Sequence, residues 1–366
     1  MPAAESSSAR GGRSSTESTF GVFSSASTNG LVTTSKYRLA VVATALASLS
    51  SLPRVILAPH PTPIDTLTRL RAALGPACPS LYMKRDDLLS FGMGGNKVRK
   101  LQTVLAEAVA AGTDTLITCG GLQSNHCRAT AAAGAALGLR VILVVNGVRQ
   151  ERPTSNALLD QLFGADVRYA SSREERAAMM DSVAEEERAA GRRPCVIPLG
   201  ASTPIGAAGF ALGIQEVLVA GLRPDVIVHS TSSGGTQAGL IAGCALFGLK
   251  TRIIGISADE SSTALSAVVR DIVEGMAGLL GGSHASLGAD RDVVVDDRFV
   301  GEGYGIPTKG SREALTLVAR HEGIVLDPVY TAKAMAGLIE RIRRDSFPVG
   351  ESVLFWHTGG QVGLFA

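Results

Sequence analysis

The amino-acid sequence predicts an α/β protein with parallel β-sheets that are covered by helices on both faces. From residue 53 onward, short apolar stretches alternate with longer helical patterns, and 42 glycines among 366 residues supply many short turns. Such alternation requires crossover connections, which place helices on the faces of a parallel sheet. Strands are expected near residues 81, 115, 140, 166, 195, 226, 252 and 353, and helices near residues 98, 126, 155, 174, 207, 236, 260, 310 and 332.

The first informative segment is a Gly-Gly-Asn turn at residues 94–96, followed by Lys97. Apolar side chains then repeat at helical spacing, at Val98, Leu101, Leu105 and Val109, and the pattern stops at Gly112. A lysine on the first turn of a helix lies at the positive end of the helix dipole, where the ammonium form is disfavoured. Lys97 therefore suits a Schiff-base lysine, although a lone lysine at such a position is more often a solvated helix charge.

The second segment repeats the arrangement of strand, glycine turn and helix. Residues 115–118 are an apolar strand, Gly120 and Gly121 form a tight turn, and residues 125–137 are an alanine-rich helical stretch. Ser124 and Asn125 therefore stand at a helix N-terminus. Unpaired backbone N–H groups there favour an anion such as a substrate carboxylate, and the serine hydroxyl can act beside it. The alternative is that Ser124 only caps the helix.

The third segment is a hydroxyl-rich loop, Thr-Ser-Ser-Gly-Gly-Thr at residues 231–236, between a strand at 225–230 and a small-residue helix at 237–247. Backbone N–H groups and hydroxyls at such a helix start can cradle a phosphate. The loop lacks the lysine of a Walker motif, and no Gly-x-Gly-x-x-Gly opens a first strand–helix unit, so neither an NTPase nor a dinucleotide fold is favoured. A plain helix cap is the alternative.

A Schiff-base lysine, a carboxylate-binding turn and a phosphate cradle together describe a pyridoxal phosphate site. The chain resembles the fold-type II (tryptophan synthase beta-like) pyridoxal phosphate enzymes, in the group that contains D-cysteine desulfhydrase and 1-aminocyclopropane-1-carboxylate (ACC) deaminase. The resemblance extends from residue 52 almost to residue 366. Its motifs are Leu57-Ala58-Pro59-His60-Pro61-Thr62-Pro63-Ile64, Lys84-Arg85-Asp86-Asp87, Gly94-Gly95-Asn96-Lys97, Gln123-Ser124-Asn125-His126, Ser233-Gly234-Gly235-Thr236-Gln237-Ala238-Gly239, Gly303-Tyr304-Gly305-Ile306-Pro307, Asp327-Pro328-Val329-Tyr330-Thr331 and His357-Thr358-Gly359-Gly360.

The resemblance implies a role for each matching residue around pyridoxal 5'-phosphate. Lys97 would hold the cofactor covalently, and Asn125 would donate a hydrogen bond to its phenolic oxygen. Ser124 would contact the substrate carboxylate and move a proton, with Asn125 and His126 completing the substrate-binding turn. The cofactor phosphate would be held by Ser233, Gly234, Gly235 and Thr236.

The same resemblance places Tyr304 and Tyr330 on the substrate side, with core packing as the alternative, and places Thr331 at the pyridine nitrogen. The deaminase branch has a glutamate at this last position, which keeps the ring nitrogen protonated. A threonine hydroxyl cannot supply that charge, and a neutral ring suits β-elimination, in which a good leaving group relieves the developing carbanion. His126 also follows the desulfhydrase-like Ser-Asn-His form.

The expected enzyme is therefore a pyridoxal phosphate-dependent lyase that converts D-cysteine to pyruvate, ammonia and hydrogen sulfide. The alternatives are ACC deamination, loss of sulfite from cysteate, and elimination from another β-substituted amino acid. A non-catalytic ligand-binding relative is the rival from another class, and intact Lys97 and Ser124 argue against it.

The resemblance also implies two domains, a smaller one inserted at residues 98–210 and a larger one of residues 36–97 and 211–366. Residues 1–35 are dominated by Ser, Thr, Gly and Ala, which bury too little apolar surface to offset the entropy of ordering, so a disordered tail is predicted. The apolar run at residues 39–49 is too short to span a bilayer and is expected to be a helix that packs on the enzyme or its twin.

Composition agrees with a soluble enzyme and the cysteines favour the cytoplasm, while the resemblance implies a homodimer that acts on a small amino acid. The net charge of +2 indicates no nucleic-acid partner and no acidic surface as a partner. The five cysteines are odd in number and lack Cys-x-x-Cys spacing, so no disulfide framework and no metal site are expected.

Overall fold

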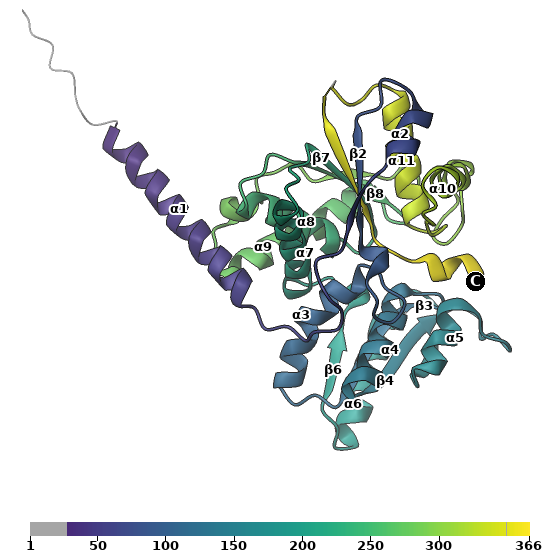
Figure 1. Ribbon diagram of the computed structural model, residues 1–366. Coiled ribbons are helices and arrows are strands. Elements are labelled where there is room, and N and C mark those ends of the chain that lie inside the picture. Colours follow the sequence, from purple (N-terminus) through teal and green to yellow (C-terminus); the bar gives the residue numbers. More distant parts are fainter. Residues whose placement is uncertain (1–27, 349) are drawn as a thin grey trace, which may run out of the picture. The chain divides into compact units, whose positions relative to one another are not determined.

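Two β-sheets organise residues 40–366 in the computed structural model, which describes residues 28–348 and 350–366 (Figure 1). The chain forms two compact units whose boundary, between Leu39 and Ala40, falls inside helix α1 (Thr28–Ser51). The helix predicted at residues 39–49 is confirmed as part of α1. Most of the predicted tail lies outside the described residues, and residues 28–35 belong to α1, so disorder of the tail stays a prediction.

The larger sheet has six strands in the order β1-β2-β10-β7-β8-β9, and all neighbours are parallel except β1 and β2. Its strands are β1 (Ile64–Thr66), β2 (Ser80–Arg85), β7 (Val226–Thr231), β8 (Arg252–Ser257), β9 (Val294–Asp296) and β10 (Ser352–His357). Every residue of β7 is buried, as expected of a central parallel strand covered on both faces.

Successive β7 residues point to opposite faces of this sheet. Val226 and Val228 pack in one layer with α2 (Thr68–Leu74), α10 (Lys309–Glu322) and α11 (Thr331–Arg343). Ile227 packs in the other layer with α7 (Pro204–Val219), α8 (Gly235–Leu246) and α9 (Ser262–Leu280), and the two groups of helices lie on opposite sides of the sheet in Figure 1.

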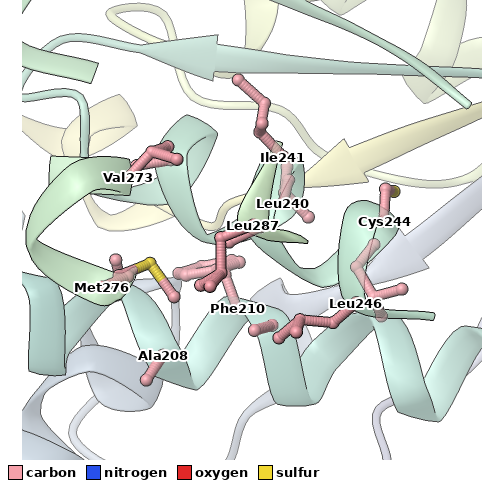
Figure 2. Packing of buried hydrophobic residues seen from close by; sticks show 14 of the residues in the cluster. Ala208, Phe210, Leu240, Ile241, Cys244, Leu246, Val273, Met276 and Leu287 are labelled. Atoms are coloured by element: carbon pink, nitrogen blue, oxygen red, sulfur yellow. The ribbon is translucent and has the colours of Figure 1, made fainter. Parts of the chain in front are cut away.

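Small residues let α7 and α8 approach closely. A Cβ at Gly239 of α8 would lie 2.1 Å from the backbone oxygen of Ala207 in α7, so only glycine fits at this crossing. The layer beside it gathers large side chains, and Figure 2 shows Phe210, Leu240 and Met276 from the three helices within it. Leu49 of α1 belongs to the same cluster.

The smaller sheet has four parallel strands in the order β5-β4-β3-β6. These are β3 (Thr115–Gly121), β4 (Arg140–Asn146), β5 (Asp166–Ala170) and β6 (Pro194–Ile197). Side chains of α3 (Lys97–Ala110) and α4 (Asn125–Leu137) pack on one face, and α6 (Arg176–Ala189) packs on the other. Helix α5 (Ser155–Leu162) contacts α4.

The predicted α/β class and all eight predicted strands are confirmed, and each predicted helix is present. The three-residue strands β1 and β9 and the seven-residue helix α2 are additional. All four strands of the smaller sheet lie within the predicted inserted domain, whereas its predicted boundary at residue 210 falls inside α7. The exact domain division stays a prediction. Within the described residues, every helix is too short or too polar to cross a membrane.

A buried charge cluster joins α3 to the larger sheet. The Arg99 guanidinium, 2% exposed, forms two 2.7 Å hydrogen bonds with the fully buried Asp86 carboxylate. It also donates to Glu216 of α7 at 2.6 and 2.9 Å, and the Trp356 indole of β10 donates to Asp86 at 2.7 Å. Lys84 of β2 pairs with Glu216 at 2.7 Å. Because each charge is paired, the cluster fixes α3 against three other elements.

Replacing Arg99 with methionine should lower the free energy of unfolding by about 3–5 kcal/mol, because the buried Asp86 carboxylate would lose its cationic partner. Urea unfolding followed by circular dichroism measures this change. Arg188→Met on the exposed side of α6 is the matched control and should shift stability by less than about 0.5 kcal/mol. Equal stability of the two variants would show that the cluster does not anchor α3.

Candidate active site

One cavity lies where the carboxyl ends of strands meet the first turns of helices. Its wall includes Gly120 and Gly121 at the end of β3, Asn146 at the end of β4, and Ser230 and Thr231 at the end of β7. The first turns of α3, α4 and α8 complete it. In open parallel sheets this edge is where ligands bind, because backbone N–H groups of the helix starts converge there.

Lys97 is the first residue of α3 and lines this cavity. The turn before it is held from two sides, because the Gly95 N–H donates to the backbone oxygen of Asp86 and the Asn96 N–H donates to that of Thr358, each at 3.0 Å. Burial lowers the pKa of the Lys97 amine to about 8, and the negative charge of Asp259 opposes this shift. Roughly one tenth of the Lys97 amine is therefore uncharged at pH 7, whereas almost none of an ordinary lysine is.

The hydroxyl-rich loop enters the same wall through Ser233, Gly234 and Thr236. Ser233 shares a 2.8 Å hydrogen bond with Ser202, and the Asn96 amide donates to the Thr236 hydroxyl at 3.1 Å. Gly235 opens α8, so the loop delivers these hydroxyls at a helix N-terminus as predicted.

Gly200 closes the space between this loop and Lys97. Its φ of 69° lies in the left-handed region, and a Cβ there would stand 2.4 Å from Ser233 Oγ and 3.3 Å from Lys97 Nζ. Backbone conformation and space both require glycine here. The loop and the Lys97 amine therefore border the same part of the cavity, and a methyl group at residue 200 would make that part smaller.

The surroundings of Lys100 indicate that this loop suits a phosphate. Its side chain is fully buried, and its amine contacts the Gly200 oxygen at 3.2 Å and Ser202 Oγ at 2.9 Å. A Cβ at Gly235 would lie 2.9 Å from Lys100 Nζ, which places the amine beside the loop. No carboxylate pairs with it within the described residues, and burial together with the charge of Lys97 holds the pKa of Lys100 well below its ordinary value. A phosphate dianion in the loop would supply the missing counter-charge.

Sequence reasoning missed Lys100, although one signal was available. It stands three residues after Lys97 on α3, and side chains at this spacing share a helix face.

Ser124 caps helix α4 and also lies in the cavity wall, and its contact with a substrate carboxylate stays a prediction. Its hydroxyl oxygen caps α4 by accepting hydrogen bonds from the N–H groups of His126 and Cys127 at 3.2 and 3.3 Å, and Ser124 also lines the cavity. The hydroxyl proton stays available to a ligand. The turn therefore presents a helix N-terminus and a hydroxyl donor to the same space.

Asn125 and His126 line the cavity beside Ser124. The Asn125 side-chain oxygen accepts a 3.0 Å hydrogen bond from Asn156 of α5, which leaves its NH₂ group as the donor toward a ligand. Asn156 was not predicted from the sequence. Burial and the charges of Lys97 and Lys100 hold the pKa of His126 well below its ordinary value, so the ring is neutral and shares a 2.8 Å hydrogen bond with Thr118.

Tyr304 and Tyr330 face each other in the cavity wall. Their hydroxyls share a hydrogen bond, and their rings meet edge to face with centroids 5.9 Å apart. Burial and the neighbouring Tyr304 raise the pKa of Tyr330 well above its ordinary value. The pair is therefore neutral at pH 7 and can donate a hydrogen bond into the cavity.

The predicted contact of Thr331 with the pyridine nitrogen stays a prediction, and the structure describes the surroundings of this residue. This residue is fully buried and lies outside the cavity wall, because its hydroxyl donates to the Asp327 carboxylate at 2.6 Å and accepts from the Asp327 N–H at 2.8 Å. Asp327 thereby caps the start of α11. A different threonine, Thr358 after β10, lines the cavity.

Three charged residues of the wall were not singled out from the sequence: Arg173, Arg176 and Asp259. Arg173 precedes α6 and pairs with Asp259 at 3.1 Å and with Glu260 at 2.5 Å, both located after β8. These ion pairs connect the two sheets across the cavity. Nothing in the periodicity of the sequence relates residues so far apart.

Comparison with known proteins identifies the chemistry associated with this cavity. The family model described as "Pyridoxal-phosphate dependent enzyme" matches residues 55–359. A D-cysteine desulfhydrase of Klebsiella pneumoniae is 38% identical over 329 residues, which cover 88% of this chain and 98% of that protein. A putative 1-aminocyclopropane-1-carboxylate deaminase of Pyrococcus abyssi is also 38% identical, over 87% of this chain and 95% of its own length.

Solved structures are also similar to this chain. A crystal structure of an ACC deaminase homologue matches with a TM-score of 0.81 and 35% identity, covering 88% of this chain and 96% of that one. A threonine deaminase of Solanum lycopersicum matches with a TM-score of 0.64 and 16% identity, over 87% of this chain and 89% of that one, and at this identity shows the fold alone.

Gly200→Ala should weaken binding of pyridoxal phosphate by about five- to 100-fold, because overpacking costs about 1–3 kcal/mol and 1.4 kcal/mol corresponds to a factor of ten. Fluorescence titration of the cofactor-free protein measures the affinity. Gly138→Ala is the matched control, since Gly138 also has a φ of 69° but open space around it. Equal affinities of the two variants would contradict the steric argument.

The Lys97 amine of the cofactor-free protein should titrate near pH 8, because burial favours its uncharged form. Its rate of modification by trinitrobenzenesulfonate, followed by peptide mapping, should rise through a midpoint near that pH. Nα-acetyl-lysine in solution should show a midpoint of about 10.4. A midpoint for Lys97 near that of the free amino acid would show that burial does not activate it.

Proposed function

Because the chain belongs to the family of pyridoxal-phosphate dependent enzymes, we propose that it is a lyase that eliminates the β-substituent of a small amino acid. D-cysteine is the leading substrate, and its products with water are pyruvate, ammonia and hydrogen sulfide. ACC deamination is the first alternative, because relatives with both names share 38% identity with this chain. Sulfite loss from cysteate is the second.

One observation carries the proposal. Lys97, the anion-binding turn at Ser124 and the hydroxyl-rich loop at residues 233–236 line the same cavity, and the pKa of Lys97 is lowered to about 8. An amine whose pKa is lowered toward neutrality loses its proton more readily than an ordinary lysine, so it can both hold the cofactor covalently and act as a base. When bound, pyridoxal phosphate supplies an electron sink for the electron pair left at Cα.

Each group of residues in the cavity wall would have its own role in binding or in catalysis. The loop from Ser233 to Thr236, with Lys100 behind it, would hold the phosphate, and the Asn125 NH₂ group would donate to the phenolic oxygen. The first turn of α4 and the Ser124 hydroxyl would orient the substrate carboxylate. Lys97 Nζ would take the α-proton while the Cβ–S bond breaks and its electron pair leaves with sulfur. The neutral Tyr304 and Tyr330 hydroxyls would donate to the leaving group.

Two features support elimination over ring-opening deamination. Position 331 is a threonine whose hydroxyl binds Asp327, so the position offers no carboxylate to keep the cofactor ring protonated. Among the described residues of the cavity wall, Asp259 is the carboxylate, and it is already paired with Arg173. A ring without a carboxylate partner favours substrates whose leaving group removes the negative charge.

The proposal further places the enzyme in the cytoplasm as a homodimer. The odd number of cysteines supports a reducing compartment. The family resemblance supports the dimer.

The test is a substrate panel assayed for keto acid, ammonia and sulfide. D-cysteine should give pyruvate and sulfide in equal amounts, whereas ACC should give little 2-oxobutanoate. Borohydride should fix the cofactor to Lys97, and Lys97→Ala should lose both this link and turnover, while Lys250→Ala at an exposed position should keep both. A preference for ACC would establish the deaminase, and full activity of Lys97→Ala would remove the proposal.

A further inference from the structure

A second cavity lies beside β4, β5 and α5, apart from the site described above. Its volume is about 300 Å³, which is enough for a small organic molecule. Val145 of β4 lines it, whereas the next residue, Asn146, lines the candidate active site. Because consecutive residues of a strand point to opposite faces of a sheet, the two cavities flank the end of β4.

Asp160 of α5 is a buried hydrogen-bond acceptor in the wall of this second cavity. It is 2% exposed, yet its Oδ1 atom has no hydrogen-bond partner and its carboxylate forms no ion pair within the described residues. Gln150 lines the same cavity, and its buried Oε1 atom also lacks a partner there. Buried oxygen atoms are normally paired, so two unpaired ones beside one space indicate a ligand with N–H donors.

Arg128 of α4 does not satisfy Asp160. Its charge acts on the carboxylate, but its Nη2 group donates to the backbone oxygen of Gly94 at 3.1 Å instead. Burial raises the pKa of Asp160 to about 8 against the effect of Arg128, and burial raises the pKa of the neighbouring Cys127 thiol, which is therefore neutral. An ammonium group bound beside Asp160 would favour the charged carboxylate, so its binding near pH 7 would release a proton.

The rest of the wall suits the other parts of an amino acid. Arg149 stands exposed at the rim and has no ion pair in the part of the chain that the structure describes. Leu122, Val145 and Val167 contribute apolar surface to the same cavity. A cation at the rim, a buried carboxylate and apolar side chains match the carboxylate, the ammonium and the side chain of an apolar amino acid.

Helix α5 connects the second cavity to the candidate active site. Asp160 lies one helical turn after Asn156. The Asn156 NH₂ group donates to the backbone oxygen of Gln123 at 2.8 Å and to the side-chain oxygen of Asn125 at 3.0 Å. Asn125 is the expected donor to the phenolic oxygen of the cofactor. A ligand that holds α5 would therefore also hold this donor.

We propose that the second cavity binds a small apolar α-amino acid, with its ammonium at Asp160 and Gln150 and its carboxylate at Arg149, and that this ligand tightens cofactor binding through Asn156. The site is separate from the proposed reaction and does not depend on it. By linkage, the bound cofactor tightens binding of the amino acid by the same factor.

Isothermal titration of the holoenzyme with each enantiomer of valine tests the site. Borohydride first reduces the cofactor, so that it cannot react with valine. The matched ligands are isobutylamine, which lacks the carboxylate, and 3-methylbutanoate, which lacks the ammonium. One enantiomer of valine should bind at least about threefold more tightly than isobutylamine and at least about tenfold more tightly than 3-methylbutanoate. Proton release should appear as a binding enthalpy that varies with the ionisation enthalpy of the buffer.

Asp160→Asn should weaken valine binding at least about tenfold and remove the proton release, because an amide offers the ammonium no charge. Arg149→Met should weaken it about two- to fivefold, because exposed ion pairs contribute little. Asp181→Asn at an exposed position of α6 is the matched control and should leave binding unchanged. Absence of valine binding, full binding by Asp160→Asn, or equal binding of valine and isobutylamine would overturn the site. If Asp160→Asn does not fold, the ligand comparison and Arg149→Met still decide it.

Pyridoxine 5'-phosphate measures the coupling, because it lacks the aldehyde and cannot react with valine. Cofactor-free protein saturated with valine should bind this probe at least about fivefold more tightly than protein without valine, as is typical of coupled sites. Asn156→Ala should abolish this difference while valine still binds. Equal affinities in the wild type would overturn the coupling. These titrations do not measure turnover, so a failure of D-cysteine to react would remove the proposed function and leave this inference standing.

Discussion

The position of α3 depends on the buried ion pair between Arg99 and Asp86. Arg99 follows Lys97 by two residues, so an anchor on the guanidinium fixes the turn that carries the amine. Glu216 and the Trp356 indole connect the same pair to α7 and β10. The cluster thus holds a helix of the smaller sheet's layer against the larger sheet. The backbone of Lys97 is held by this anchor and by the hydrogen bonds of Gly95 and Asn96 before it.

A repeated local geometry brings the functional groups together. Three times a buried strand or extended segment ends, a glycine-containing turn follows, and a helix begins with a polar residue in its first turn. Parallel strands end at the same edge of a sheet, so these helix starts converge on one space. Side chains from residues 97, 124 and 236 meet although the chain separates them widely. Their positive helix ends also explain why an anionic ligand suits the cavity.

Much of this arrangement could be predicted from the sequence, because periodicity and glycine placement determine where strands stop and helices start. Lys97, Ser124 and the loop at residues 233–236 were identified in this way, and the structure places them in one cavity. The hydrogen bond between Thr331 and Asp327 was not predicted, because no spacing in the sequence reveals it. Asn156 and Arg176 were not predicted, because no spacing in the sequence shows that Asn156 bonds to Asn125 or that Arg176 lines the cavity.

The burial of Lys100 without a carboxylate partner has a consequence for folding. Burying the Lys100 amine without a carboxylate partner costs free energy, and an anion bound in the adjacent loop would offset this cost. Any ligand that binds only the folded state shifts the folding equilibrium toward it. Binding of pyridoxal phosphate beside Lys100 would therefore raise the free energy of unfolding and make the folded enzyme more resistant to proteolysis.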